Sequence, residues 1–185
     1  SGHWVHADNP SFFIDKTINF LNWKMENHII RKANSSDVKD ILRLLIELAV
    51  YEKDPDAVKI SEKDLLDDGF RDNPRYECFI AEYNTEIVGL AFYTPRYSTW
   101  DGKTLHLEDL VVTKKMRGKG IGLSLYKSFL NEAKKQGVNR VEWSVLDWNK
   151  PAIDFYLKSG ALIDDYSKWK IVRMNKSIIE KFLSS

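Results

Sequence analysis

Residues 111–122 have the sequence Val-Val-Thr-Lys-Lys-Met-Arg-Gly-Lys-Gly-Ile-Gly, and they connect an expected strand (104–113) to an expected helix (121–136). Glycine at alternate positions from Gly118 to Gly122 lets the backbone turn its N–H groups toward a ligand and lets that ligand come close to the main chain. A helix that begins here adds unpaired N–H donors and the positive end of its dipole. Cationic side chains follow one another at Lys114, Lys115, Arg117 and Lys119. The stretch therefore predicts a binding site for a pyrophosphate group.

Two common phosphate-binding motifs do not match this stretch. A P-loop requires Ser or Thr after Gly-Lys, whereas Gly120 follows Lys119. A dinucleotide-binding fingerprint requires G-x-G-x-x-G, whereas residues 118–122 have the spacing G-x-G-x-G. The alternative is a plain glycine-rich turn with solvated lysines. The strand, the cations and the helix together favour phosphate binding.

Strand and helix patterns mix along the rest of the chain without a linker between them. Ser35 or Ser36 is expected to cap a first helix, and Ser61 with Asp64 three residues later predicts a second helix that ends at Gly69. Further strands are expected over 28–32, 76–83, 86–94, 139–146 and 170–175, with a hairpin turn at 84–85. A late helix is expected from Asn149 to Gly160, with Pro151 in its first turn, and a terminal helix over 177–183. This order predicts one α/β domain without internal repeats.

The composition excludes several classes of protein. The chain has 185 residues with a formal net charge of +1, which gives no bulk attraction to nucleic acid or to an anionic membrane. Its longest mainly apolar run, 87–93, is far shorter than the about 18 residues that a membrane span requires. Cys78 is its one cysteine, which rules out an internal disulfide and is typical of a reducing compartment. A cytoplasmic location is therefore expected.

Residues 1–24 differ in pattern from the sequence that follows Met25. They lack the basic start and the apolar run of a signal peptide. We expect residues 1–24 to be an expression remnant or a non-native extension, and residues 25–185 to form the domain. The alternative is a genuine extension whose aromatic residues cover apolar surface, at Trp4, Phe12, Phe13, Phe20 and Trp23.

The loop at 117–122, RGKGIG, matches the R/Q-x-x-G-x-G/A signature of the GNAT superfamily of N-acetyltransferases. Other segments resemble one branch of it, the spermidine/spermine and thialysine (diamine) acetyltransferases, namely DILRLLIELAVYEK (40–53), SEKDLLDDGF (61–70), YSTWDGK (97–103), LHLEDLVV (105–112), VLDWNKPAIDFY (145–156) and SGA (159–161). The resemblance covers about residues 29–174. It implies the GNAT acyl-CoA N-acyltransferase fold, a single mixed, mostly antiparallel sheet flanked by helices, with acetyl-CoA as co-substrate.

The resemblance also assigns site residues by position. Cofactor-binding groups are implied at Leu110, Val111, Val112, Arg117, Gly118, Lys119, Gly120, Ile121, Gly122, Leu123, Asn149, Lys150, Pro151 and Ala152. Substrate-binding groups are implied at Tyr51, Glu52, Glu108, Glu142, Trp143 and Ser144. Tyr156 matches the general acid of the family.

The residue types suit acetylation of an amine. A lysine-like amine has a pKa near about 10.4, so a carboxylate is needed to accept its proton, and Glu108 is the candidate. Asp109 follows it, and because neighbouring strand residues point to opposite faces, at most one of the two readily faces the substrate. Glu108 could instead be a solvent-facing acid, and Tyr156, which would protonate the leaving thiolate, could instead be a core residue. Cys78 has no basic neighbour in the sequence and is expected to be an inert thiol, so direct transfer is expected.

The acceptor amine is expected to be a small cationic metabolite. Glu52, Asp54, Asp56, Glu108 and Glu142 could form an acidic rim that attracts it, and Trp100 and Trp143 could add cation–π contacts. The alternatives are a solvated acidic surface for the carboxylates and core packing for the tryptophans. Residues 97–100 and 145–149 resemble the thialysine enzymes more than the polyamine enzymes, which favours the side-chain amine of thialysine or a related diamine.

Three other functions stay open at this point. They are a polyamine acetyltransferase, a non-catalytic acyl-CoA sensor and a protein acetyltransferase. The resemblance implies a homodimer. No nucleic-acid or membrane partner is expected, and no metal site is expected because His3, His6, His28 and His106 lack ligand spacing.

Overall fold

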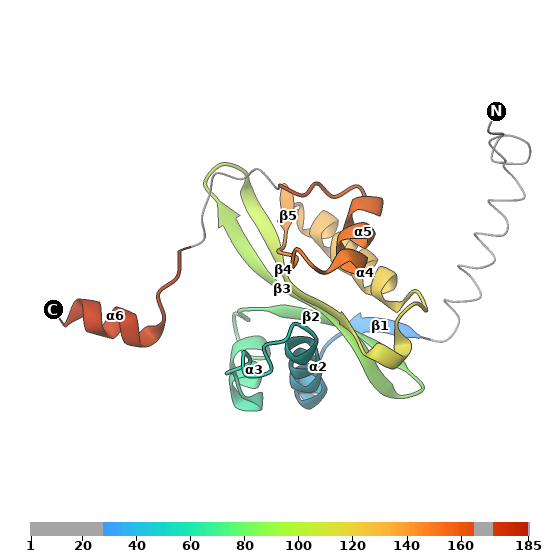
Figure 1. Cartoon of the computed structure of the whole chain (residues 1–185), viewed down its shortest axis with the longest axis horizontal. Coiled ribbons are helices and arrows are strands. Elements are labelled where there is room, and N and C mark those ends of the chain that lie inside the picture. Colours follow the sequence, from blue (N-terminus) through green and yellow to red (C-terminus); the bar gives the residue numbers. More distant parts are fainter. Residues whose placement is uncertain (1–27, 165–171, 185) are drawn as a thin grey trace, which may run out of the picture. The chain divides into compact units, whose positions relative to one another are not determined.

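A computed structural model describes residues 28–164 and 172–184 of the chain. These residues form two compact units, the first ending at Ser144 and the second beginning at Val145. Figure 1 labels their helices and strands. The first unit carries the sheet and most of the core, and the second carries two helices.

The first unit contains a five-stranded sheet in the order β1-β2-β3-β4-β5. The first three neighbouring pairs are antiparallel and β4–β5 is parallel, which confirms the expected mixed, mostly antiparallel sheet. Its elements are β1 (Ile29–Lys32), a short 3₁₀ turn (Ser35–Asp37), α2 (Val38–Tyr51), α3 (Glu62–Gly69), β2 (Glu77–Tyr83), β3 (Glu86–Ser98), β4 (Gly102–Val112), a second 3₁₀ turn (Lys114–Met116), α4 (Ile121–Gln136) and β5 (Arg140–Glu142).

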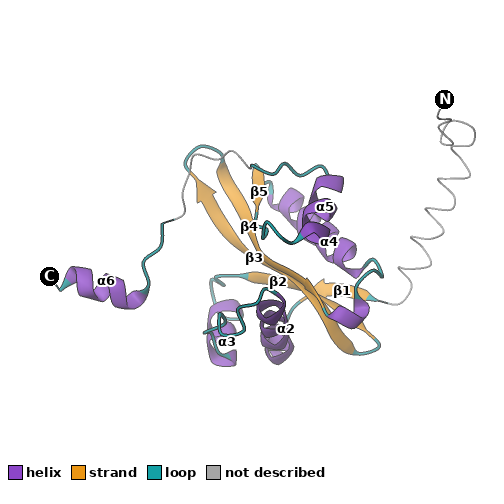
Figure 2. Ribbon diagram, in the orientation of Figure 1, coloured by secondary structure: helices purple, strands orange, loops and turns teal. Residues whose placement is uncertain are grey.

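Helices cover both faces of this sheet, with α2 and α3 on one face and α4 on the other (Figure 2). On the α2 side, Ile41 and Leu44 pack with Leu90 of β3 in a fully buried cluster. On the α4 side, Phe129 packs against Tyr93, with ring centroids 5.3 Å apart. Each fully buried Leu or Ile side chain contributes about 2 kcal/mol through removal of apolar surface from water. The two cores hold β3 and β4 in place between the helices.

Local sequence signals account for several of these elements. Asn84 and Thr85 both have positive φ, 48° and 68°, which is the geometry of a tight two-residue hairpin and confirms the predicted turn. Ser61 and Asp64 form the predicted capping box of α3. Gly137, at φ 63°, ends α4 as predicted.

Other boundaries differ from the predictions. Asn34, rather than Ser35 or Ser36, caps the first helical segment, because its side chain accepts from the Ser36 N–H. Strand β3 continues past Pro95 to Ser98 instead of ending near Thr94. β2 pairs with β3 only as far as Tyr93, so beyond that residue β3 is paired with β4 alone. The strand tolerates Pro95 because an edge segment does not need an N–H donor on its unpaired side.

The strand expected over 139–146 is limited to Arg140–Glu142. It pairs with β4 only over Thr104–His106, and the chain leaves the sheet afterwards. The last expected strand, 170–175, is wrong in the part that the structure describes, since 172–175 have no strand pairing. Residues 170 and 171 lie outside the described residues, as do residues 1–24.

The second unit contains α5 (Lys150–Lys158) and α6 (Lys176–Leu183). Asn149 caps α5 by accepting from the Ala152 N–H, and Pro151 lies in the first turn, both as predicted. Asn175 caps α6 in the same way by accepting from Ile178 N–H.

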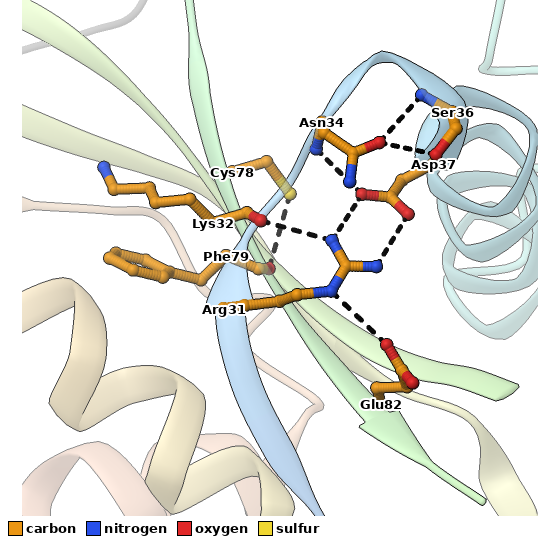
Figure 3. A network of polar contacts seen from close by, with 8 residues as sticks. All are labelled: Arg31, Lys32, Asn34, Ser36, Asp37, Cys78, Phe79 and Glu82. Carbon is orange, nitrogen blue, oxygen red and sulfur yellow. Dashed lines mark hydrogen bonds and ion pairs between the residues drawn. The ribbon is translucent and has the colours of Figure 1, made fainter. Parts of the chain in front are cut away.

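An ion-pair network joins β1 to the start of α2 (Figure 3). Arg31 donates to both carboxylate oxygens of Asp37 at 2.7 and 2.9 Å, and its Nε donates to Glu82. The hydrogen bonds from Arg31 hold the pKa of the buried Asp37 carboxyl below its ordinary value. A lowered pKa in the folded state means that the pair stabilises the fold above the ordinary carboxyl pKa, and that this contribution is lost as the pH falls through the lowered value.

Candidate active site

The glycine-rich loop has the geometry of an anion cradle. Gly118 and Gly120 both adopt the left-handed region, at φ 74° and 83°, which an L side chain rarely adopts. Gly120 is the N-cap of α4 and offers no capping side chain to the first turn of this 16-residue helix. The N-terminal N–H groups of α4 therefore have no cap side chain to accept from them, and they can bind a phosphate oxygen.

Helix α2 fixes the start of this loop. Glu47 accepts from the Thr113 hydroxyl at 2.8 and 2.9 Å and from the Lys114 N–H at 2.9 Å. Arg117 donates from Nε to the Val112 carbonyl at 2.9 Å, and its guanidinium lies 4.6 Å above the ring centroid of Tyr51. The predicted substrate residue Tyr51 thus contacts the predicted cofactor loop. Glu47 could not be identified from the sequence, because only tertiary packing brings α2 to this loop.

Strand β4 offers an open edge next to the loop. On its β5 side it is paired only over Thr104–His106, so within residues 28–164 and 172–184 no strand pairs with the remainder of that edge. The implied cofactor residues Leu110, Val111 and Val112 lie in this remainder. Main-chain N–H and C=O groups of an unpaired edge are available to an extended ligand such as a pantetheine arm.

A β-bulge interrupts β4 at Glu108. Phe92 pairs with Asp109 and Tyr93 pairs with Leu107, which leaves Glu108 as an extra residue without a partner in β3. Strict alternation of faces therefore does not hold here, and the expectation that only one of the two acids faces the substrate does not apply. The Glu108 carboxylate is exposed and accepts from the Thr94 hydroxyl at 3.1 Å.

Three carboxylates of the first unit influence one another electrostatically. Burial, together with the smaller effect of the charges of Glu52 and Glu108, raises the pKa of Asp109 to about 6. Burial also raises the pKa of Glu52. A carboxylate with a pKa close to neutrality is suited to accept a proton. Asp109 was not among the predicted site residues, since its raised pKa depends on packing and on Glu52, which is distant in sequence.

Glu142, implied as a substrate residue, is bound by two arginines. Arg96 of β3 donates from Nη1 to its Oε1, and Arg140 lies with Nη2 3.0 Å from its Oε2. The predicted acidic rim is therefore partly neutralised at this position. Its neighbour Trp143 packs edge-to-face on Tyr126 at 5.8 Å, while Ser144 and Trp100 are exposed.

The other predicted site residues belong to the second unit. Tyr156 is a buried residue of α5, with its ring 5.3 Å from that of Phe155. Asn149 caps α5, and Lys150, Pro151 and Ala152 form its first turn. The structure thus groups Tyr51, Glu52, Glu108 and the loop in one unit, and Tyr156 with the Asn149 turn in the other.

The described residues also bear on three other points: a reactive cysteine, a metal site and a membrane-spanning helix. Cys78 is buried, and burial raises the pKa of its thiol, which disfavours the nucleophilic thiolate. The described part of the chain contains no group of three or more His, Cys, Asp or Glu residues that could hold a metal ion. No helix among the described residues is long and apolar enough to cross a membrane.

Comparison with known proteins gives concordant matches. Residues 39–161 match the family model described as the Acetyltransferase (GNAT) family. Thialysine N-epsilon-acetyltransferase of Bos taurus is 43% identical over 141 residues, which are 72% of this chain and 83% of that protein. Spermidine/spermine N(1)-acetyltransferase-like protein 1 of Homo sapiens is 38% identical over 160 residues, 82% of this chain and 23% of that protein. An integron cassette protein from the V. cholerae mobile metagenome superposes with a TM-score of 0.69 at 25% identity, covering 86% of this chain and 99% of its own.

Proposed function

The chain belongs to the GNAT family of acetyltransferases, and from this premise we propose that it transfers the acetyl group of acetyl-CoA directly to the side-chain amine of thialysine or a related diamine. The chain is an acetyltransferase enzyme, so a non-catalytic sensor is not retained. The observation that carries the acceptor is the identity of 41–43% to thialysine N-epsilon-acetyltransferases over most of the chain.

Acetyl-CoA fits the residues present in the loop. A Cβ added at Gly118 would meet no atom within 4 Å, so there is space for part of a ligand beside this residue. The uncapped start of α4 and the exposed Lys114, Lys115 and Lys119 supply donors and positive charge for a pyrophosphate. When bound, acetyl-CoA supplies the thioester whose acetyl group is transferred. We assign the loop to the pyrophosphate and the open edge of β4 to the pantetheine arm.

The carboxylates of the first unit serve the acceptor. We assign Glu108 as the group that takes the proton from the ammonium, with Asp109 and Glu52 adding negative charge that holds a cationic acceptor. Tyr156 is assigned as the donor of a proton to the leaving thiolate. The ammonium gives one proton to Glu108 before attack and a second as the amide forms. Tyr156 protonates the leaving thiolate and is reprotonated, through solvent, by that second proton, so that one net proton leaves the site from Glu108.

A steady-state assay of thiol release tests the acceptor. We expect kcat/KM to be higher for thialysine than for lysine or putrescine. We also expect it to be higher than for spermidine or spermine, because the acidic rim that would hold a polycation is partly neutralised at Glu142. A higher kcat/KM for spermidine would move the enzyme to polyamine acetylation, the second candidate, which the match to the spermidine/spermine-like protein supports.

The pH dependence tests the carboxylate cluster. We expect kcat/KM for the acceptor to fall below about pH 6, since protonation of Asp109 removes negative charge from the site. In Asp109→Asn this acidic limb disappears, while Glu108→Gln lowers kcat and retains a limb. A limb at the same pH in Asp109→Asn would show that another group titrates there.

Three further expectations remain proposals. We propose a homodimer, testable by light scattering during size-exclusion chromatography, and a cytoplasmic location. We also propose that residues 1–24 are dispensable, and removal of this segment with retained activity would support that boundary.

A further inference from the structure

A row of polar side chains crosses β3, β4 and β5 beside the bulge. Thr94 pairs with His106, and His106 pairs with Glu142, so these three residues occupy successive strands at one level. Arg96 lies two residues beyond Thr94 in β3 and therefore shares its face. The row contains a cation, Arg96, and an imidazole, His106, that none of the assignments above uses for recognition.

His106 lies between Arg96 and Glu108. Its Nδ1 is 3.3 Å from Arg96 Nη1, and its Nε2 is 3.8 Å from Glu108 Oε2. One imidazole ring therefore separates a guanidinium from the proposed base. A lysine-type amino acid likewise carries a primary amine at one end and an α-carboxylate at the other.

The guanidinium of Arg96 has donor groups that make no hydrogen bond among the described residues. Its contacts with Glu142 and His106 both use Nη1, and its Nε and Nη2 donate to no acceptor within residues 28–164 and 172–184. The Nε–Nη2 edge of a guanidinium matches the two oxygens of a carboxylate. The side chain is 55% exposed, so a ligand can reach this edge.

The carboxylate of Glu142 is not available to bind a cationic ligand. Both its oxygens face guanidinium groups, Oε1 toward Arg96 and Oε2 toward Arg140 at 3.0 Å. Arg140 in turn pairs with Asp101. The distal ammonium of a diamine that approached this end of the row would meet the guanidinium of Arg96 rather than a carboxylate free to bind it.

We propose that Arg96 determines acceptor specificity by binding the carboxylate of an amino-acid acceptor while Glu108 faces the reacting amine, and by repelling the distal ammonium of a diamine or polyamine. This inference rests on the proposed function and names the acceptor class, amino acids with a terminal side-chain amine. Arg96 is a binding residue in this scheme and takes no part in proton transfer.

A matched pair of acceptors tests the proposal. Thialysine and bis(2-aminoethyl) sulfide have the same thioether chain and differ by the carboxylate. In Arg96→Gln we expect kcat/KM for thialysine to fall about tenfold through KM, the lower end of the range for a charged hydrogen bond because the site is partly exposed. We expect kcat/KM for the sulfide to rise, because a repelling charge is removed.

Arg140→Gln is the matched control. It removes the same charge and a contact with the same Glu142, but Arg140 does not contact His106. Because it uncovers Oε2 of Glu142 but leaves Arg96 in place, we expect it to leave the KM for thialysine unchanged and to change the ratio of the two kcat/KM values by less than Arg96→Gln does. Equal losses for both acceptors in Arg96→Gln, or the same change of ratio in Arg140→Gln, would overturn the role of Arg96 while the proposed function stands. Failure of the unaltered enzyme to use either acceptor would instead overturn both.

Discussion

Replacement of Tyr156 by Phe is expected to lower kcat by about 100-fold, with little change in the KM for acetyl-CoA. The substitution removes only the phenolic oxygen, and general-acid catalysis contributes factors of about 10² to 10⁴. Tyr156 is a buried residue of α5, and Phe preserves its apolar ring. Steady-state kinetics with thialysine measures the effect, and single-turnover experiments show whether the loss lies in the chemical step.

Tyr76→Phe is the control for hydroxyl removal. The Tyr76 hydroxyl donates to the Leu65 carbonyl at 2.7 Å, which links the residue before β2 to α3. Loss of this hydroxyl should lower thermal stability and leave kcat unchanged. If Tyr156→Phe retains the full single-turnover rate, the proton on the leaving thiol comes from another group, and Tyr156 has only a packing role in the core.

Gly118→Val is expected to weaken acetyl-CoA binding by about 100-fold, which corresponds to about 2.7 kcal/mol. Gly118 has φ 74°, and a β-branched residue can adopt this conformation only with strain, so the loop must rearrange and its N–H groups lose their orientation. Any side chain that does remain in place extends into the open space above the loop. Isothermal titration with coenzyme A measures the change.

Gly137→Val separates strain from binding. Gly137 has φ 63°, its added Cβ also meets nothing within 4 Å, and it is the C-cap of α4, the helix that follows the loop of Gly118. Both variants should lose similar thermal stability, whereas only Gly118→Val should lose affinity. Equal affinity in the two variants would mean that the pyrophosphate is not bound by this loop.

The fold could be predicted where the signal is local. The Asn84-Thr85 turn, the capping box of α3 and the glycine at the end of α4 each depend on a few neighbouring residues, and each was predicted correctly. The strand over 139–146 was predicted too long because its length depends on β4, which pairs with it only over three residues.

The candidate site shows the same division. The cofactor loop is continuous in sequence, so its motif was visible. Glu47, which holds that loop, is far from it in sequence and carries no motif. The bulge at Glu108 and the raised pKa of Asp109 also arise from pairing and burial. Glu142 was expected to attract a cation, because its two arginine partners could not be identified before the strands were paired.

Burial of Cys78 makes this chain a convenient host for site-specific labels. The sequence has no other cysteine, and the Cys78 side chain is buried with a thiol pKa raised by that burial. Maleimide dyes react with exposed thiolates and should leave it unmodified. A cysteine introduced at an exposed position such as Lys127 on α4 would then carry a fluorophore or spin label alone, without prior removal of a native thiol.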